Sequence, residues 1–388
     1  AGVRLAWRIA GPAGTPVVAA LGGISAHRRV YSTEARETGW WHEVAGPGQA
    51  FPADRLRVLS FDYLGGSGET TGPRDGQDFP SISSYDQAEL LRRLLDHLGI
   101  RALRAIVGAS YGGMVALAFG ERHPDRVEQL VVVSASDRTH PMSTAWRSVQ
   151  RRMVRFAIDC GRPKDGLQLA RALAMSTYRS PEEFAARFSG APRAAERGFV
   201  FPVEDYLMAR GADYATRYQP DGFLCLSESI DLHRVDAGRI FVPVTAVAVR
   251  EDQLVPVADM RAMVARLPHA KLQEISSLYG HDAFLKEADA DFYEEFIARC
   301  IARVKAIKQG DPRDPSTMVG AQASQQQHDK IMSYLQIGVE EGAEVLTGGD
   351  AAHLGAGTGG ALVHIQTHDL AQQRVIGAAA RRAVGRAA

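Results

Sequence analysis

The stretch "IVGASYGGMVAL", Ile106–Leu117, places a serine between small residues. An apolar run precedes Ser110 and a helix-compatible run follows it, so the serine lies where a strand would turn into a helix. The spacing Gly-x-Ser-x-Gly in that context is typical of a nucleophile elbow, whose glycines let strand and helix pass closely while the hydroxyl projects outward. A plain glycine-rich turn is the alternative, but the flanking patterns favour the elbow.

Two later segments could activate Ser110. A serine hydroxyl is a weak nucleophile unless a base takes its proton, and the base needs an acid that orients it. In α/β-hydrolases these groups follow in the order serine, acid, histidine. Asp252 comes just after the apolar run "VPVTAVAV", and His281 lies in the turn "SSLYGHDAF". We predict a catalytic triad of Ser110, Asp252 and His281; a solvated loop carboxylate and a surface histidine are the alternatives.

An oxyanion hole needs two backbone N–H groups, one from the residue after the nucleophile and one from the loop after an early strand. Tyr111 is the residue after the serine. The segment "PVVAALGGIS" offers Leu21 and Gly22 in the second place. We predict Leu21, Gly22 and Tyr111 as the oxyanion donors, although a plain turn would explain the paired glycines equally well.

Short β-branched and apolar runs recur along the chain and alternate with amphipathic stretches. Such runs suit strands that are buried on both faces of a sheet. They lie at 16–21, 57–64, 103–108, 129–135 and 242–249. The stretch 84–99 has an acidic first turn, leucines at helical spacing and a closing glycine, which predicts a helix. The alternation predicts an α/β fold with a mostly parallel central sheet.

The strand pattern stops and later resumes, which predicts an inserted domain. Residues 1–137 and 236–290 form the predicted core, and the arginine-rich amphipathic segment 138–235 is a predicted helical cap. Residues 291–349 are polar and helical in pattern. The tail 350–388 is rich in alanine, glycine and arginine, a composition of poorly ordered segments. The last two segments together are an atypical C-terminal extension.

Charge and cysteine content narrow the function classes. Lysine plus arginine equals aspartate plus glutamate at 45 each, so the chain as a whole lacks the basic excess of a nucleic-acid-binding protein. No apolar run approaches the roughly 18 residues of a membrane span. The three cysteines are widely spaced and show no disulfide framework or zinc-site spacing. We expect a cytoplasmic enzyme acting on small molecules, with no metal and no membrane partner.

Residues 2–290 resemble the homoserine O-acyltransferase family of the α/β-hydrolase fold. The resemblance covers "GWWHEVAGPGQAFPADRLRVLSFDYLGGSGETTGP", "VGASYGGMVALAFGERHPDRV", "TYRSPEEFAARF", "VEDYL" and "YGHDAFL". It implies an enzyme of methionine biosynthesis that acylates homoserine from acyl-CoA by a ping-pong mechanism through an acyl-Ser110 intermediate. Acyl-CoA is then a substrate, and no cofactor is expected. The resemblance also implies a homodimer formed through the cap helices.

The resemblance assigns further roles to single positions. Arg179 in "TYRS" matches the arginine that contacts substrate, and Asp282 matches an aspartate suited to the amino group of the acceptor. The segment "STAWRSVQRR", which contains Arg147, resembles the succinyl-using branch of the family. An arginine at this position could pair with the distal carboxylate of the donor. We expect succinyl transfer to L-homoserine; an acetyl donor and an L-serine acceptor are the alternatives.

Residues 292–349 resemble a fragment of an aldehyde dehydrogenase, in "GDPRDPSTMVGAQAS" and "EEGAEVLTGG". The dinucleotide-binding half and the nucleophile segment of that family have no counterpart here, so we expect no dehydrogenase chemistry. Two rival hypotheses remain for the whole chain. One is a serine hydrolase acting on an ester or thioester, and the other is a non-catalytic chimeric chain whose tail provides only association surface.

Overall fold

The computed structural model describes residues 2–32, 38–74 and 78–286, and of the remainder only 314, 316–317, 329, 333, 351–353 and 361–363. The chain forms two compact units. The first comprises residues 1–46 and 53–289, and the second comprises residues 47–52 and 290–388. The predicted helical fragment 291–349 and the tail 350–388 therefore lie almost wholly outside the described residues.

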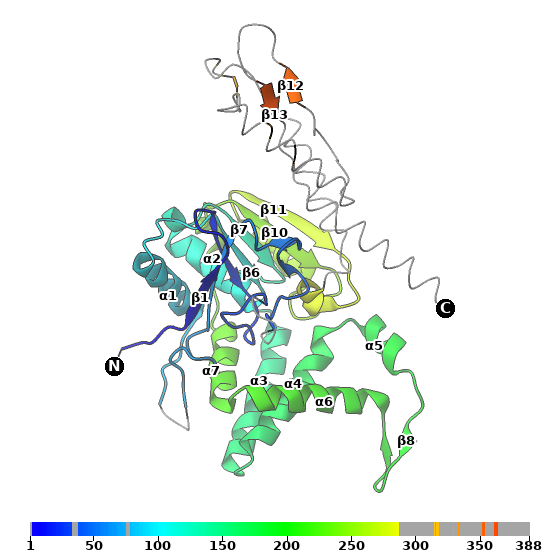
Figure 1. Ribbon diagram of the computed structural model, residues 1–388. Coiled ribbons are helices and arrows are strands. Elements are labelled where there is room, and N and C mark those ends of the chain that lie inside the picture. The colour runs from blue at the N-terminus through cyan, green and yellow to red at the C-terminus, as the bar shows by residue number, and fades with distance from the viewer. Residues whose placement is uncertain are drawn as a thin grey trace. The chain divides into compact units, whose positions relative to one another are not determined.

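A seven-stranded sheet forms the centre of the first unit (Figure 1). Its strands follow the order β1-β5-β2-β6-β7-β10-β11. They span β1 (Trp7–Ala10), β2 (Val17–Leu21), β5 (Arg57–Phe61), β6 (Ala105–Ala109), β7 (Leu130–Val133), β10 (Val244–Val249) and β11 (Ala270–Ile275). Only β1 runs antiparallel to its neighbour; every other adjacent pair is parallel. The predicted mostly parallel α/β sheet is confirmed.

The parallel strands bring distant loops to one edge of the sheet. The register pairs Leu21 of β2 with Gly108 of β6, and Val249 of β10 with Ile275 of β11. Since parallel strands end at the same edge, the loops that follow β2, β6, β10 and β11 share that edge, where open α/β sheets bind ligands. The strands are buried on both faces: Ala19, Ala20 and Leu21 are at most 1% exposed. Their apolar runs therefore do not alternate.

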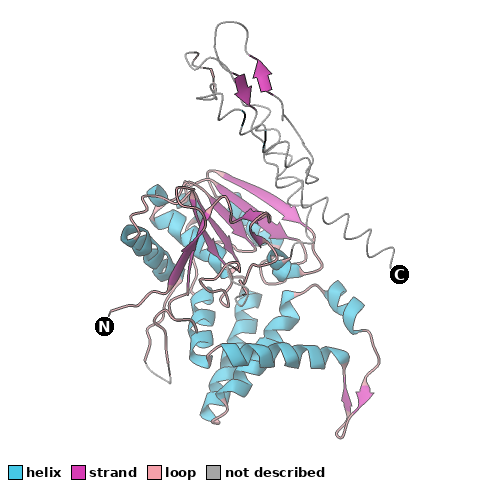
Figure 2. Cartoon of the chain, viewed as in Figure 1, coloured by secondary structure: helices cyan, strands magenta, loops and turns pink. Residues whose placement is uncertain are grey.

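Three core helices cover the sheet (Figure 2). They are α1 (Ser84–His97), α2 (Tyr111–Arg122) and α8 (Val257–Val264). The core also contains the short 3₁₀ turns η1 (Pro124–Arg126), η2 (Ala237–Arg239) and η3 (Gly280–Leu285). Ten consecutive residues of α2, Tyr111 to Gly120, are buried. A helix that is apolar all round belongs in the interior, so α2 holds Ser110 at a rigid place.

The segment between β7 and β10 forms a helical cap. Its helices are α3 (Pro141–Asp159), α4 (Pro163–Tyr178), α5 (Pro181–Phe188), α6 (Pro202–Arg217) and α7 (Pro220–Asp231), with the short pair β8 (Arg193–Ala194) and β9 (Phe199–Val200). Helix α4 packs against both α3 and α6. The cap has a small core of its own that includes Val154, Leu167, Tyr214 and Phe223.

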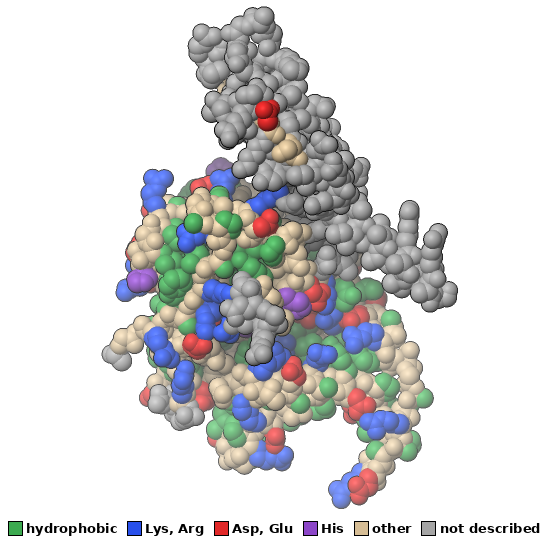
Figure 3. Space-filling view, viewed as in Figure 1, with side chains coloured by type: hydrophobic (Ala, Val, Ile, Leu, Met, Phe, Trp, Pro, Cys, Tyr) green, Lys and Arg blue, Asp and Glu red, His purple; other side chains and the backbone are tan. Residues whose placement is uncertain are grey.

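Charged side chains of both signs are interspersed over the face of the core and cap drawn in Figure 3. The remaining short strands are β3 (Ala45–Gly46) and β4 (Phe51–Pro52). In the second unit, β12 (Ala351–His353) and β13 (Ala361–Val363) form an antiparallel pair.

The glycines of the elbow generate a stability prediction. A Cβ on Gly108 would overlap the carbonyl oxygen of Gly112, and a Cβ on Gly112 would overlap that of Leu21. Because backbone atoms cannot swing aside like a flexible side chain, we expect Gly108→Ala to lower the free energy of unfolding by about 3 kcal/mol. Urea unfolding measures this. Gly190→Ala is the control, since its Cβ would lie 3.5 Å from Pro202; equal stability of the two variants would contradict the prediction.

Candidate active site

Ser110 lies on a strained turn between β6 and α2. Its φ is +53° and its ψ is −121°, a conformation that non-glycine residues rarely adopt and that costs of order 1–3 kcal/mol. The close packing of Gly108 and Gly112 holds it there. The result is a hydroxyl that faces a cavity, as an elbow requires.

The three side chains of the predicted triad meet in one hydrogen-bonded chain. His281 Nε2 lies 2.8 Å from Ser110 Oγ, and His281 Nδ1 lies 2.7 Å from Asp252 Oδ2. A carboxylate only accepts hydrogen bonds, so Nδ1 carries the proton and Nε2 of the neutral ring is free to accept from the serine. The chain therefore has the geometry to remove the Ser110 proton.

Asp252 and His281 are both buried. The other carboxylate oxygen of Asp252 accepts from the N–H groups of Leu254, at 2.8 Å, and Val255, at 3.0 Å, which fix the orientation of the carboxylate. Burial by itself lowers the pKa of His281. The charge of Asp252, the hydrogen bond to it and the charge of Asp282 outweigh burial, and the pKa of His281 is raised above its usual value.

The loop that carries His281 is anchored by residues far away in the sequence. Gly280 has a φ of +55°, which lets the chain turn directly before the histidine. Trp41 Nε1 donates to the carbonyl of Phe284 at 2.6 Å, and the Trp41 ring stacks on Trp40. The tryptophan pair therefore holds the histidine loop in place.

Core and cap together enclose a cavity of about 400 Å³ above the serine. Ser110, His281 and Asp282 line it from the core, and Arg147 and Arg171 line it from the cap. Gly23 and Ile24 line it next to the serine. A nucleophile, a base and charged groups of both signs thus face one space of substrate size.

The predicted oxyanion donors need one correction. Tyr111 is the first residue of α2, so its N–H has no intrahelical partner. Leu21 and Gly22 do not line the cavity; the Gly22 carbonyl instead accepts from Gly112 N–H at 2.9 Å and from the Tyr63 hydroxyl at 2.7 Å. Gly23, two residues after the end of β2 at Leu21, lines the cavity beside the serine instead.

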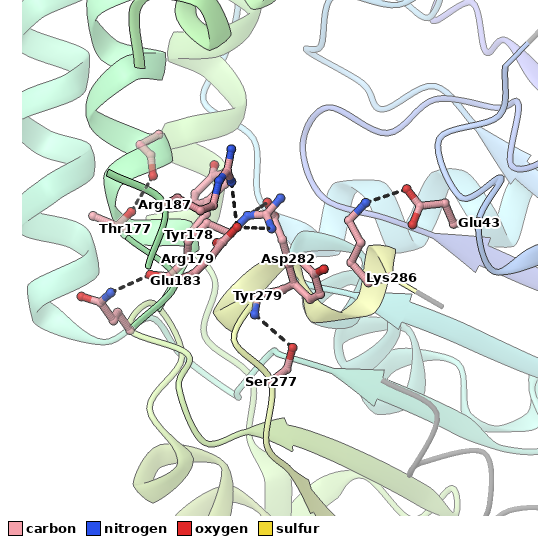
Figure 4. Close-up of polar contacts among 12 residues, drawn as sticks. Glu43, Thr177, Tyr178, Arg179, Glu183, Arg187, Ser277, Tyr279, Asp282 and Lys286 are labelled. Carbon is pink, nitrogen blue, oxygen red and sulfur yellow. Dashed lines mark hydrogen bonds and ion pairs between the residues drawn. The ribbon is translucent and has the colours of Figure 1, made fainter. Parts of the chain in front are cut away.

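Arg179 and Asp282 contact each other, and only Asp282 lines the cavity above Ser110. Arg179 Nε is 3.1 Å from Asp282 Oδ2, and Arg179 Nη1 is 3.5 Å from Glu183 (Figure 4). Its carbonyl accepts from Gln253 in the loop after Asp252. Asp282 lines the cavity beside Ser110, whereas Arg179 does not. Arg179 is thus in a position to hold Asp282, with carboxylates already paired to its guanidinium.

Arg171 lines the cavity, although no sequence motif points to it. Its guanidinium lies over the rings of Tyr178 and Tyr214, at 4.9 and 4.7 Å, and donates to the Tyr178 hydroxyl at 3.2 Å. No ion pair to Arg171 occurs among the residues that the structure describes. The available signal was an arginine inside the apolar stretch "LQLARALAM", where a solvated side chain is not expected.

Arg147 lies on α3 in a cluster with one acid. Its Nε is 2.9 Å and its Nη2 2.7 Å from Asp231 Oδ1, while Arg151 Nη1 is 2.6 Å from Asp231 Oδ2. Two arginines therefore share one carboxylate, and all three side chains are close to nine-tenths buried. Arg147 lines the cavity and lowers the pKa of His281 against the acidic neighbours. The cluster leaves an excess of positive charge near the base.

Within the described ranges, no three histidine, cysteine or acidic side chains are placed to hold a metal ion. No helix described there is long and apolar enough to cross a bilayer.

Two family models match parts of the chain. The family described as alpha/beta hydrolase fold matches residues 35–288, and the aldehyde dehydrogenase family matches residues 288–364. A solved homoserine O-acetyltransferase from Bacillus anthracis superposes with a TM-score of 0.68 at 19% identity, over 76% of this chain and 91% of that one. That likeness shows the fold.

Sequence relatives narrow the family. A homoserine O-succinyltransferase of Xanthomonas campestris pv. campestris is 43% identical over 290 residues, 74% of this chain and 76% of that protein. A homoserine O-acetyltransferase of Thermus thermophilus is 34% identical, over 65% and 69%. A serine O-succinyltransferase of Litchfieldella anticariensis is 32% identical, over 67% and 82%. The chain belongs to the homoserine O-acyltransferase family of the α/β-hydrolase fold.

Proposed function

We propose that the protein transfers the succinyl group of succinyl-CoA to the hydroxyl of L-homoserine, through a succinyl ester on Ser110. The observation that carries this proposal is the hydrogen-bonded chain of Asp252, His281 and Ser110, which lies beside a cavity with uncompensated positive charge. The 43% identity to a homoserine O-succinyltransferase supports it. Such a product has an activated hydroxyl, as the early steps of methionine synthesis need.

In the first half-reaction, His281 takes the Ser110 proton and the serine oxygen attacks the thioester carbonyl. The oxyanion that forms accepts from the N–H groups of Tyr111 and Gly23. The carbon–sulfur bond then breaks, and the protonated histidine returns its proton to the sulfur of CoA. Asp252 stabilises the imidazolium during this step without taking its proton.

In the second half-reaction, the acceptor hydroxyl gives its proton to His281 and its oxygen attacks the ester carbonyl on Ser110. The bond between the acyl carbon and Ser110 Oγ then breaks, and His281 returns the proton to Ser110 Oγ. Arg171 is placed to bind the acceptor's carboxylate, and Asp282 to bind its amino group. Burial raises the pKa of Asp282, whereas the charges of Arg179, Arg171 and His281 and the hydrogen bond to Arg179 lower it; the net shift is upward. An arriving ammonium group favours the ionised carboxylate. Arg171 takes over the substrate contact predicted for Arg179.

The donor preference rests on Arg147. Succinyl differs from acetyl by a distal carboxylate, which would compensate the excess charge of the Arg147–Arg151–Asp231 cluster. An L-serine acceptor is the second candidate, supported by the serine O-succinyltransferase relative. Serine is one methylene shorter than homoserine, a difference of about 1–3 kcal/mol in a fitted pocket.

The raised pKa of His281 sets a pH dependence. The base works only when neutral, so kcat falls as the pH drops through the pKa of His281. Asp252→Asn removes the charge that raises this pKa and leaves the wrong tautomer, so the acidic limb moves to lower pH and kcat falls on the order of 10³-fold or more. A pH–rate profile checks this, with Asp125→Asn, an exposed carboxylate on η1, as the control. If the acidic limb of the pH–rate profile stayed at the same pH in Asp252→Asn, the assignment of His281 as the base and Asp252 as its partner would be contradicted.

The choice between Arg171 and Arg179 is testable with an acceptor analogue. 3-Amino-1-propanol is homoserine without its carboxylate. We expect the wild type to prefer homoserine, and Arg171→Ala to remove about ten- to hundredfold of that preference, since a hydrogen bond to a charged group contributes about 1.5–3 kcal/mol. Arg179→Ala should slow both acceptors but keep the preference. The reverse pattern in kcat/KM ratios would return the carboxylate contact to Arg179.

The donor and acceptor are tested together by mass spectrometry. Succinyl-CoA or acetyl-CoA is offered with homoserine or serine, beside Ser110→Ala. We expect O-succinylhomoserine from the wild type and no product from Ser110→Ala. Arg147→Asn should lower kcat/KM for succinyl-CoA about tenfold or more while that for acetyl-CoA is kept. Arg155→Asn, an exposed arginine on the same helix, is the matched control. Release of CoA without an acylated amino acid would favour a hydrolase.

A further inference from the structure

A second cavity adjoins the active site and is lined mainly by basic side chains. Its volume is about 320 Å³. It shares Arg171, Tyr214, Arg217 and Asp282 with the cavity above Ser110, so the two have a common wall. The basic residues that line it are Arg171, Arg179, Arg187, Arg210, Arg217 and Lys286. The two acidic residues among its lining are Asp213 and Asp282.

Carboxylates compensate only part of this charge. Glu183 binds Arg187 at 2.8 Å and also pairs with Arg179, which reaches Asp282 as well (Figure 4). These contacts use two carboxylates for two arginines.

Two further basic residues of this cavity are each paired with one carboxylate. Arg217 pairs with Asp213, and Lys286 Nζ lies 2.6 Å from Glu43. Figure 4 shows Lys286 extending to Glu43 from the same loop that carries Asp282.

Arg210 and Arg171 account for the excess. Arg210 lies over the ring of Tyr206, at 5.7 Å, and Arg171 lies over two tyrosine rings. In the part of the chain that the structure describes, neither has a carboxylate within ion-pair distance. Six cations thus face one small space with four carboxylates to balance them, which makes the space attractive to a polyanion.

We propose that this cavity binds the phosphate groups of the acyl-CoA donor. The proposal rests on the proposed function, because it assigns a place to the far end of the donor. The thioester of acyl-CoA must reach Ser110, while its charged end lies at the other end of a flexible arm. A cationic cavity that shares a wall with the catalytic one can hold that end. Arginine is suited to this role because its planar guanidinium binds phosphate bidentately.

Arg210→Ala tests the site by kinetics, since this arginine has no carboxylate to leave unpaired. We expect the KM for succinyl-CoA to rise about tenfold. The KM for the truncated donor succinyl-N-acetylcysteamine, which lacks phosphates, should not change, and neither should the KM for homoserine. Arg193→Ala, an exposed cap arginine paired with Asp205 outside this cavity, is the control. An equal effect of Arg210→Ala on both donors would overturn the proposal.

Calorimetry provides a measurement that does not depend on turnover. We expect the wild type to bind CoA and adenosine 3′,5′-bisphosphate, and Arg210→Ala to bind both about tenfold more weakly. Equal affinity in the variant would overturn the site, even if acyl transfer is observed. Inorganic phosphate that binds as tightly as the bisphosphate would overturn the assignment to the donor. Bisphosphate binding that depends on Arg210, in a protein that transfers no acyl group, would refute the proposed function and keep the site.

Discussion

The close backbone approach around Ser110 is the constraint on which the other features depend. Strand β6, helix α2 and the end of β2 meet so tightly that Gly108 and Gly112 leave no room for a side chain. That packing holds the serine in a conformation it would otherwise avoid and aims its hydroxyl at the cavity. The apolar burial of α2 and β6 stabilises the elbow against this strain. The same packing therefore stabilises the fold and holds the Ser110 hydroxyl in position.

The core and the cap contribute different side chains to the site, and the arrangement of the sheet explains why. Parallel strands end at one edge, which brings Ser110, Asp252 and His281 together although they are far apart in the sequence. The cap then covers that edge and adds charged groups, chiefly Arg147 and Arg171, that the core lacks. Changes in the cap can therefore alter which substrate is bound while the triad keeps its geometry.

Local pattern explains why the triad positions could be predicted. Each of the three residues follows a strand-like run, and the alternation of strands and helices implies that such ends meet. Strand β1 is not among the predicted strands because "WRIA" is a short edge segment without an apolar run. The motif that predicts a substrate contact for Arg179 specifies a residue type but not the direction of its side chain. Arg179 lies eight positions after Arg171, and the end of α4 turns it toward Asp282 and Glu183.

The sequence by itself determined the α/β class, the position of the elbow, the order of the serine, aspartate and histidine that meet in one hydrogen-bonded chain, and the presence of an inserted cap. These depend on spacing and periodicity, which act over a few residues. Only the tertiary structure decided which arginines line the cavity above the serine and where unbalanced positive charge gathers. Those properties depend on how α3, α4 and α6 pack over the sheet. Ion pairs form between side chains that are far apart in the sequence, so the sequence alone does not show which charges are compensated.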